Sequence, residues 1–415
     1  MSEWKEVRLG EVVQINPESL TKDYPFNVID YIDISSVGTG ELRETTQYPI
    51  SEAPSRAKRL VRAGDTILST VRPNRRSFLY LKKPKENQVV STGFAVLRAT
   101  EKINSRYLYY LISDQKFTDY LVSQEKGAAY PAVSIDSIKN AIVLLPDLET
   151  QEKIASILGS IDDKIELNVE MNKTLEEMAM TLYKHWFVDF GPFQDGEFVE
   201  SELGMIPKGW RVGNLGDLIQ VQNGYAFKSK EWKSEGIPVI KIKNISPPLI
   251  NKEDVAYVDV SLIDKLERFI LKQGDLLIGM TGAEIGKCGI YYYEEPAFLN
   301  QRVGKFYSNN DEINTLPLVY TITRLPDFQQ KILDNSTGSA QPNISADGIR
   351  SLKIVLPPTD ILKEFINLIN DTYSMIINNA NENYKLKNIR DYLLPRLLSG
   401  EIDLSEAEKQ VEEVL

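Results

Sequence analysis

The chain has 415 residues, of which 42% are hydrophobic, one is cysteine (Cys288) and one is histidine (His185), so it is long enough for two or three domains with separate cores. The single cysteine excludes an internal disulfide, and the shortage of Cys and His leaves almost no material for a zinc site or a Ser/His or Cys/His catalytic arrangement. The net charge is −11, and no run of apolar residues is long enough for a membrane helix, which indicates a soluble cytoplasmic protein.

The first predicted element is a globular domain over residues 1–147. Strand-like stretches such as "TILSTV" and "FAVLRA" alternate there with the helical pattern "SRYLYYLISDQKFTDYLV", which predicts a mixture of strands and helices. Residues 56–85 carry ten basic residues and one acid, a net charge of +9 within an acidic chain. Such a stretch favours DNA binding, because phosphate contacts dominate affinity; a solvated basic face is the alternative.

The basic stretch contains "TVRPNRRSF", in which a proline stiffens a loop that leaves a predicted strand. Arginine reads guanine O6 and N7, and asparagine reads adenine N6 and N7. A later loop, residues 127–134, is rich in small residues, and its Tyr130 either contacts DNA or only shapes the turn. The DNA-binding candidates of the first domain are Lys58, Arg59, Arg72, Asn74, Arg75, Arg76 and Tyr130.

The next element is a long helix over residues 148–191. Its apolar positions follow the 4-3 spacing of a coiled-coil seam. The seam residues are Ile154, Leu158, Ile161, Ile165, Asn168, Asn172, Leu175, Ala179, Leu182 and Trp186.

A second globular domain, residues 192–357, repeats the first. "WKEVRLGEVVQI" (4–15) matches "WRVGNLGDLIQV" (210–221), "RAGDTILSTV" (62–71) matches "KQGDLLIGMT" (272–281), and "GAAYPAVSIDSI" (127–138) matches "GSAQPNISADGI" (338–349). Tyr225 and Phe227 are better explained as core residues than as base-stacking ones. The segment 282–289 lacks the spacing of a phosphate-binding loop. The DNA-binding candidates here are Lys228, Lys241, Lys243, Asn244, Lys287, Gln341 and Asn343.

A second long helix, residues 358–400, continues the repeat, and an acidic tail over residues 401–415 is expected to be disordered or bound to a partner. The asparagines stand at matching places on both seams, where they cost stability but fix register. The two helices are therefore predicted to pair antiparallel with each other; the alternative is that each packs only on its own domain. The second seam is Phe365, Ile369, Thr372, Ile376, Asn379, Asn383, Leu386, Arg390, Leu393 and Leu397.

Several long stretches resemble the specificity subunits of type I restriction-modification systems (HsdS). They are "LPDLETQEKIASILGSIDDKIELN" and "LEEMAMTLYKHWFVDFGPF" around the first helix, "ELGMIPKGW", "QNGYAFKSKEW", "PVIKIKNI" and "GDLLIGMTGAEIGKCGI" in the second half, and "STVRPNRR" and "STGFAVL" in the first. The second helix departs from the pattern in one respect, because it lacks the Glu-Gln-Lys-Ile-Ala start of the first. The resemblance covers nearly the whole chain.

The resemblance implies an α+β fold with two tandem α/β target-recognition domains, separated by two long conserved helices that form an antiparallel coiled coil with an internal pseudo-two-fold repeat. It implies that each domain reads one part of an asymmetric double-stranded DNA site. The helices set the spacing and recruit two methyltransferase (M) subunits, and restriction (R) subunits join them. Adenine N6 methylation and its S-adenosylmethionine belong to the partner, so this chain is expected to be noncatalytic and to need no cofactor or metal.

Two other functions stay open from the residues alone. A noncatalytic coiled-coil scaffold that joins two protein-binding domains is favoured by the acidic total charge and disfavoured by the basic stretch at 56–85. A self-contained methyltransferase or nuclease needs a cofactor loop or a carboxylate-lysine metal site, and the sequence shows neither.

Overall fold

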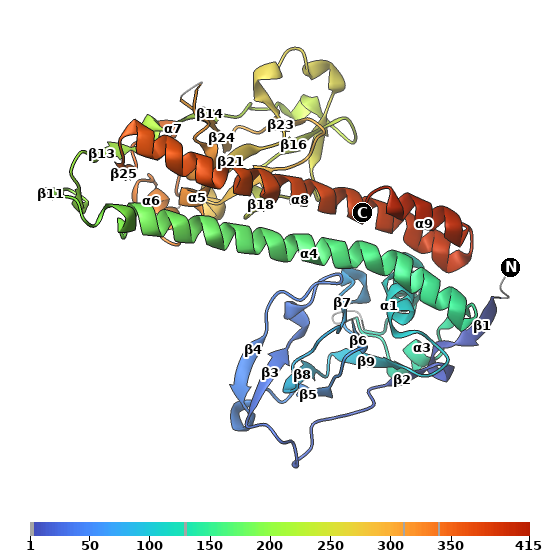
Figure 1. The fold of residues 1–415 in the computed structure, drawn as a ribbon. Coiled ribbons are helices and arrows are strands. Elements are labelled where there is room, and N and C mark those ends of the chain that lie inside the picture. Colours follow the sequence, from blue (N-terminus) through green and yellow to red (C-terminus); the bar gives the residue numbers. More distant parts are fainter. Residues whose placement is uncertain (1–3, 128–130, 310–311, 339–340) are drawn as a thin grey trace. The chain divides into compact units, whose positions relative to one another are not determined.

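The computed structural model describes residues 4–127, 131–309, 312–338 and 341–415 (Figure 1). The chain divides into two compact units. The first unit is Met1–Lys164 with Leu386–Leu415, and the second is Ile165–Lys385. Each unit therefore contains one β-rich domain and a part of both long helices.

The domain of the first unit has two four-stranded sheets and a two-stranded ladder. One sheet has the order β2-β9-β6-β7, the other β4-β3-β8-β5, and β1 pairs antiparallel with β10. The strands are β1 (Lys5–Arg8), β2 (Val13–Ile15), β3 (Val28–Ile32), β4 (Thr46–Pro49), β5 (Ala57–Leu60), β6 (Thr66–Ser69), β7 (Phe78–Tyr80), β8 (Gln88–Ser91), β9 (Phe94–Ala99) and β10 (Ile142–Leu145). The helices are α1 (Ser105–Ser113), α2 (Gln115–Ser123) and α3 (Ile135–Lys139).

The domain of the second unit repeats this plan with added strands. Its sheets have the orders β14-β24-β21-β22-β18-β17 and β15-β19-β16-β23-β20, and β13 pairs with β25 as β1 does with β10. The strands are β11 (Phe198–Ser201), β12 (Gly204–Pro207), β13 (Arg211–Asn214), β14 (Ile219–Asn223), β15 (Trp232–Lys233), β16 (Ile237–Ile240), β17 (Ile245–Ser246), β18 (Leu249–Ile250), β19 (Ala256–Val258), β20 (Ile270–Leu271), β21 (Asp275–Gly279), β22 (Cys288–Tyr291), β23 (Ala297–Leu299), β24 (Val303–Ser308) and β25 (Lys353–Leu356). The helices are α5 (Leu316–Thr323), α6 (Phe328–Asp334) and α7 (Ala346–Arg350).

The central strand of each domain has apolar residues at its centre, and it is buried. All four residues of β6 are buried, as are the last four of β21. Each of these strands follows a Gly-Asp turn whose glycine has a left-handed backbone, with φ of +87° at Gly64 and +91° at Gly274. The repeated "GD" of the sequence therefore marks the entry into the central strand of each domain.

Two long helices, α4 (Leu148–Phe187) and α8 (Thr359–Ser399), pack against each other, as the sequence predicts. The side chain of Asp147 caps the start of α4 by accepting a hydrogen bond from the Thr150 amide at 2.9 Å. α4 ends at Phe187, four residues before the predicted boundary, and Phe190 turns the chain with φ of +51°. The α+β fold with two β-rich domains and two paired helices is thus confirmed.

The acidic tail differs from the expectation of disorder, because it forms helix α9 (Leu404–Glu412). Asp403 caps this helix by accepting from the Ser405 amide. Ala407 and Val411, four residues apart, are buried on one face of α9. The sequence analysis overlooked this pair because the surrounding acids dominate the composition.

Candidate nucleic-acid interface

Three loops meet at one end of the central strands in the first domain, and we call them loop cluster 1. The first loop, residues 70–76, leaves β6; the second, residues 92–93, joins β8 to β9; the third is the described part of residues 124–134. Most of the strongest DNA-binding candidates lie on the first of these loops.

Backbone hydrogen bonds hold loop cluster 1 together. The Thr70 amide donates to the carbonyl of Gly93 at 2.9 Å, and the Val133 amide donates to the carbonyl of Thr70 at 2.8 Å. The Arg72 amide donates to the carbonyl of Pro131 at 2.9 Å. These backbone bonds fix the path of the loops, and the Thr70 hydroxyl adds a side-chain hydrogen bond to the carbonyl of Gly93 at 2.9 Å.

The second domain builds the same arrangement, loop cluster 2, from residues 280–286, 300–302 and the described part of 335–345. The Met280 amide donates to the carbonyl of Arg302 at 3.1 Å, and the Ile344 amide donates to the carbonyl of Met280 at 3.0 Å. The Gly282 amide donates to the carbonyl of Pro342 at 2.9 Å. The three ties of loop cluster 1 thus recur, with an offset of 209 to 211 residues.

The loop at Arg72–Arg76 folds as a short 3-10 turn, η4 (Pro73–Arg75), between two residues with left-handed backbones. Arg72 has φ of +49° and Arg76 has φ of +52°, and such conformations cost an arginine about 1 kcal/mol. In loop cluster 2 the matching residues are Gly282 and Gly286, with φ of +73° and +78°. Strained non-glycine residues of this kind are concentrated at functional sites.

The side chains of this loop divide into two groups. Arg76 is held inside the domain: its guanidinium donates to Gln115 and to the carbonyl of Ser113, and it lies 5.9 Å from the ring centre of Phe78. Asn74 and Arg75 are exposed, and Arg72 is half-buried. Arg76 therefore positions the loop, whereas Arg72, Asn74 and Arg75 form its outer surface.

Other members of the basic stretch pair with acids elsewhere in the first unit. Arg62 lies 2.7 Å from Glu18, Lys82 lies 2.8 Å from Asp163, and Lys85 lies 3.1 Å from the buried carboxylate of Asp30. These pairs reduce the positive charge that faces solvent.

Lys58 and Arg59 lie on the edge strand β5. Lys58 is exposed and has no acidic partner within the described residues, whereas Arg59 is half-buried and donates to the Ser19 hydroxyl at 3.3 Å. Lys58 is therefore the better placed of the two for contact with a phosphate.

The basic candidates near the start of the second domain occupy three different settings. Lys228 and Lys243 are exposed. The ammonium of Lys241 lies 3.9 Å from the ring centre of Trp232, and burial lowers the pKa of this lysine. Asn244 is buried; its amide oxygen accepts from the Lys241 amide at 3.0 Å, and its amide nitrogen donates to the carbonyl of Glu253 at 3.1 Å. Asn244 thus shapes its loop with both ends of its amide.

The aromatic residues of this region form a cluster of their own. The rings of Tyr225 and Phe227 have centres 4.9 Å apart, and Phe227 also packs on Trp232 and Phe298. This packing agrees with the interpretation of Tyr225 and Phe227 as core residues.

Loop cluster 2 presents a different set of groups from loop cluster 1. Gln341 and Asn343 are exposed, and Lys287 pairs with Glu284. Gln301 and Arg302 are also exposed in this cluster, although neither is among the candidates predicted from the sequence. They stand between β23 and β24, at the place that Thr92 and Gly93 occupy in the first domain. Tyr130 lies outside the described residues.

Hydrogen bonds between the asparagines of α4 and α8 are present within the second unit. Asn168 donates to Asn383 at 2.9 Å and to Glu382 at 2.6 Å, and Asn379 donates to Asn172 at 2.8 Å. As the numbers rise on one helix they fall on the other, so the pairing is antiparallel. Most of the apolar seam residues are buried: Ile154, Leu158, Ile161, Phe365, Ile369, Ile376, Leu386 and Leu393, with Ile165, Leu175 and Leu182 partly exposed.

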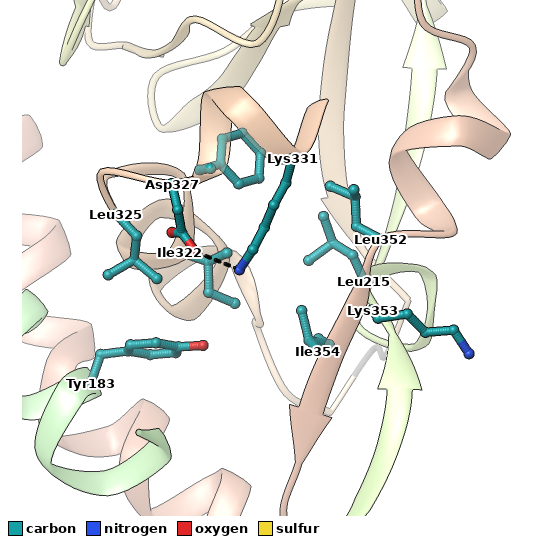
Figure 2. A pocket seen from close by; sticks show the side chains of 10 residues that line it. Tyr183, Leu215, Ile322, Leu325, Asp327, Lys331, Leu352, Lys353 and Ile354 are labelled. Carbon is teal, nitrogen blue, oxygen red and sulfur yellow. Dashed lines mark ion pairs between the residues drawn. The ribbon is translucent and has the colours of Figure 1, made fainter. Parts of the chain in front are cut away.

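The described residues contain no group of three or more His, Cys, Asp or Glu that could hold a metal ion. None of their helices has the length and apolarity needed to cross a bilayer. Figure 2 shows Tyr183 and Leu215 at a small cavity, with the Lys331–Asp327 ion pair beside it. The volume of this cavity is about 30 Å³. This volume holds about one water molecule and is far smaller than a substrate pocket.

The whole chain is similar to known proteins. Residues 1–177 and 207–388 match the family model described as "Type I restriction modification DNA specificity domain". The HindI specificity subunit of Haemophilus influenzae is 25% identical, with 97% of this chain and all of that protein covered. The MjaIX specificity subunit of Methanocaldococcus jannaschii is 28% identical, with 97% and 89% covered.

A solved structure has the same fold. It is the crystal structure of the S subunit of a type I restriction-modification system from M. genitalium, which is 14% identical and has a TM-score of 0.58 over 95% of this chain and 96% of that one. With two tied loop clusters on two β-rich domains and a paired-helix connection, the chain belongs to the type I restriction-modification specificity subunits. It is the DNA specificity subunit of such a complex, a noncatalytic subunit without a cofactor of its own.

Proposed function

We propose that the two domains read the two halves of one asymmetric, bipartite site in double-stranded DNA, each through its loop cluster. The proposal is supported by one observation: the two loop clusters have matching backbone hydrogen bonds but different side chains. These are Arg72, Asn74 and Arg75 on loop cluster 1, and Gln301, Arg302 and Gln341 on loop cluster 2. Asn343, Lys58, Lys228, Lys241, Lys243 and Lys287 supply further contacts to bases or phosphates. Because the side chains differ, the half-sites differ.

The recognition domains span residues 1–147 and 192–357 in this proposal, and the helices 148–191 and 358–400 hold them at a fixed spacing, with the tail at 401–415. A helix of about 40 residues is roughly 60 Å long. A rod of this length is well suited to separate two readers, since half-sites lie about 34–36 Å or a multiple of it apart.

The helices also hold two methyltransferase subunits, which carry S-adenosylmethionine and methylate adenine N6; restriction subunits join them, and the complex acts in the cytoplasm. This docking is supported by apolar side chains that the helices leave exposed. Leu167, Val169 and Met178 on α4 and Leu368 and Met375 on α8 each expose between 43% and 57% of their surface. A partner that covers these side chains removes their apolar surface from water.

The test is modified-base sequencing of DNA from cells that carry this gene with its neighbouring methyltransferase gene, beside cells in which only this gene is deleted. We expect a bipartite adenine-methylated motif that vanishes on deletion. An unchanged methylome, with the methyltransferase shown to be expressed, contradicts the proposal. Salt-dependent duplex binding by the assembled complex separates DNA recognition from a protein-binding scaffold.

A domain exchange adds a second test. Replacing residues 192–357 by the corresponding domain of a relative with another motif is expected to change only one half of the methylated site. A change in both halves contradicts the assignment of one half-site to each domain. Loss of all methylation is interpreted only after the exchanged chain is shown to bind its methyltransferase.

A further inference from the structure

At two equivalent positions of the loop clusters, one cluster has arginine where the other has glycine. The hydrogen bond from Thr70 to Gly93 corresponds to the one from Met280 to Arg302, so Gly93 and Arg302 are equivalent. The bond from Arg72 to Pro131 corresponds to the one from Gly282 to Pro342, so Arg72 and Gly282 are equivalent. Loop cluster 1 thus has arginine at the first-loop position and glycine at the second-loop position, whereas loop cluster 2 has glycine at the first and arginine at the second.

Packing explains why the first domain has no side chain at position 93. A Cβ atom on Gly93 would clash with Cδ1 of Ile34, which fills this space. The matching side chain of the second domain, Arg302, is exposed and has no ion pair within the described residues. The loop at 300–302 therefore carries a cation at the position where the loop at 92–93 has a glycine packed on Ile34.

Backbone conformation explains the glycine on the other loop. Gly282 has φ of +73°, and a Cβ atom there would have no heavy atom within 4 Å, so the space is open but the backbone favours glycine. Arg72 keeps an arginine in the same conformation, with φ of +49°. The first domain thus keeps a non-glycine residue with a left-handed backbone at position 72, where the second domain has glycine.

We propose that each recognition domain reads one guanine with one arginine, Arg72 in the first domain and Arg302 in the second, from opposite loops of the same frame. This inference rests on the proposed function. A guanidinium donates two parallel hydrogen bonds to O6 and N7 of guanine, which a lysine ammonium cannot reproduce. Each half-site therefore contains a G·C pair, and the two pairs lie at different places relative to their loop clusters.

The experiment uses the complex of the full chain with its methyltransferase subunits. The motif is first obtained by modified-base sequencing, and methylation rates are then measured on duplexes in which each G·C pair is replaced by A·T. We expect R302G to lose discrimination at one position of one half-site, by about 5- to 150-fold. R72G is expected to do the same at one position of the other half-site.

The lysine variants separate base reading from attraction to phosphate. R302K and R72K keep the positive charge, so we expect them to retain the salt dependence of binding while losing the discrimination. R268G is the matched control, because Arg268 is an exposed arginine of the second domain that lies on Phe269, outside loop cluster 2. It is expected to leave both half-sites unchanged.

Three results overturn the inference while the proposed function stands: a bipartite motif in which one half-site lacks a G·C pair, lysine variants with full discrimination, or R72G and R302G altering the same half-site. A methylome that does not depend on this chain rejects the proposed function itself. Folding of each variant is checked by circular dichroism, and the lysine variants keep the test valid if a glycine variant is unstable.

Discussion

The two recognition domains share a backbone frame, but they stabilise its central turn differently. In both, an aspartate that begins the central strand accepts a hydrogen bond from a backbone amide three residues earlier: Asp65 from Arg62 at 2.9 Å, and Asp275 from Lys272 at 2.8 Å. Asp65 is fully buried and accepts two bonds from the Arg98 guanidinium, each 2.8 Å long. Asp275 instead pairs with the single ammonium of Lys305.

The difference shows which parts of the frame are fixed and which can change. The amide bonds and the aspartate recur, because the turn and the loop ties depend on them, whereas the cation comes from β9 in one domain and from β24 at another register in the other. Side chains that make no hydrogen bond within the frame, unlike that of Arg76, are therefore the ones expected to vary without moving the loops. If each loop cluster reads one half-site, as proposed, the subunit acquires a new half-site by replacing these side chains on the same backbone frame.

The largest expected effect is a test of this shared turn. D65A removes both hydrogen bonds between Asp65 and the nearly buried guanidinium of Arg98, and leaves the carboxylate of Glu18, 2.6 Å away, as its acidic partner. Because the bonds to Asp65 are the largest cause of the raised pKa of Arg98, the change should destabilise the first domain by about 3–5 kcal/mol. D275A should cost the second domain only about 1–3 kcal/mol, because the flexible Lys305 side chain can turn toward water. Native-state hydrogen exchange on β6 and β21 measures each domain separately.

The same exchange data contain the control. Protection of β21 should be unaffected by D65A, and protection of β6 by D275A. Equal losses in the two domains, or a larger loss with D275A, contradict the view that Asp65 is the more deeply integrated of the two residues.

A medium effect is expected where the helices of the two repeats contact each other. N168L leaves the amide of Asn383 without its donor in a buried layer, which should cost about 1–3 kcal/mol. The double change N168L/N383L removes both polar groups and should recover that loss or add stability, at the expense of register. Urea unfolding of the four variants in a double-mutant cycle measures the coupling, and strict additivity contradicts it.

The sequence was sufficient to predict the repeat, the two domains and the helix pair, because each depends on a pattern that the chain states twice. The 4-3 spacing placed Ile154, Ile161 and Phe365 on faces that are buried in the structure. Of the two alternatives for the tail at 401–415, disorder was wrong, because Ala407 and Val411 are buried on a helix although acids dominate its composition.

The loop clusters were only partly predictable. Charge pointed to Arg72–Arg76, but it could not show that Arg76 is held by Gln115 and Ser113 or that Asn244 is buried. Arg302 escaped notice because it stands alone between two strands, and only tertiary hydrogen bonds bring its loop beside residues 280–286. Composition shows which part of the chain is rich in charge, but only the folded structure shows which of these charges already have a partner.

A smaller effect concerns the paired positions 72 and 282. G282A puts a Cβ atom into open space, so its cost of about 1 kcal/mol comes from the left-handed backbone alone. R72G relieves a similar strain but gives the unfolded chain more freedom, so the net change should stay within about 0.5 kcal/mol. Urea midpoints of the two variants measure this; a large loss with R72G would mean that the Arg72 side chain supports the fold.

The smallest expected effect is a pH dependence at the contact between the first domain and α4. Hydrogen bonds from Arg106, opposed by partial burial, hold the pKa of Asp163 at about 2, below its usual 3.8. A lowered folded-state pKa means stability that is present above the unfolded pKa and is lost as pH falls through the folded one. Because 43% of the Asp163 side chain is exposed, the loss should stay below about 1 kcal/mol.

The variant D163N should be less stable than the wild type near neutral pH and equal to it near pH 2, with the two curves converging below about pH 4. In the second domain the sign is opposite: burial raises the pKa of Asp275, so protonation there relieves a cost instead of removing a contact. Acid should thus weaken protection of α1 before that of β21 in hydrogen exchange corrected for intrinsic rates. Parallel loss in both segments would mean that neither carboxylate sets the acid response of its domain.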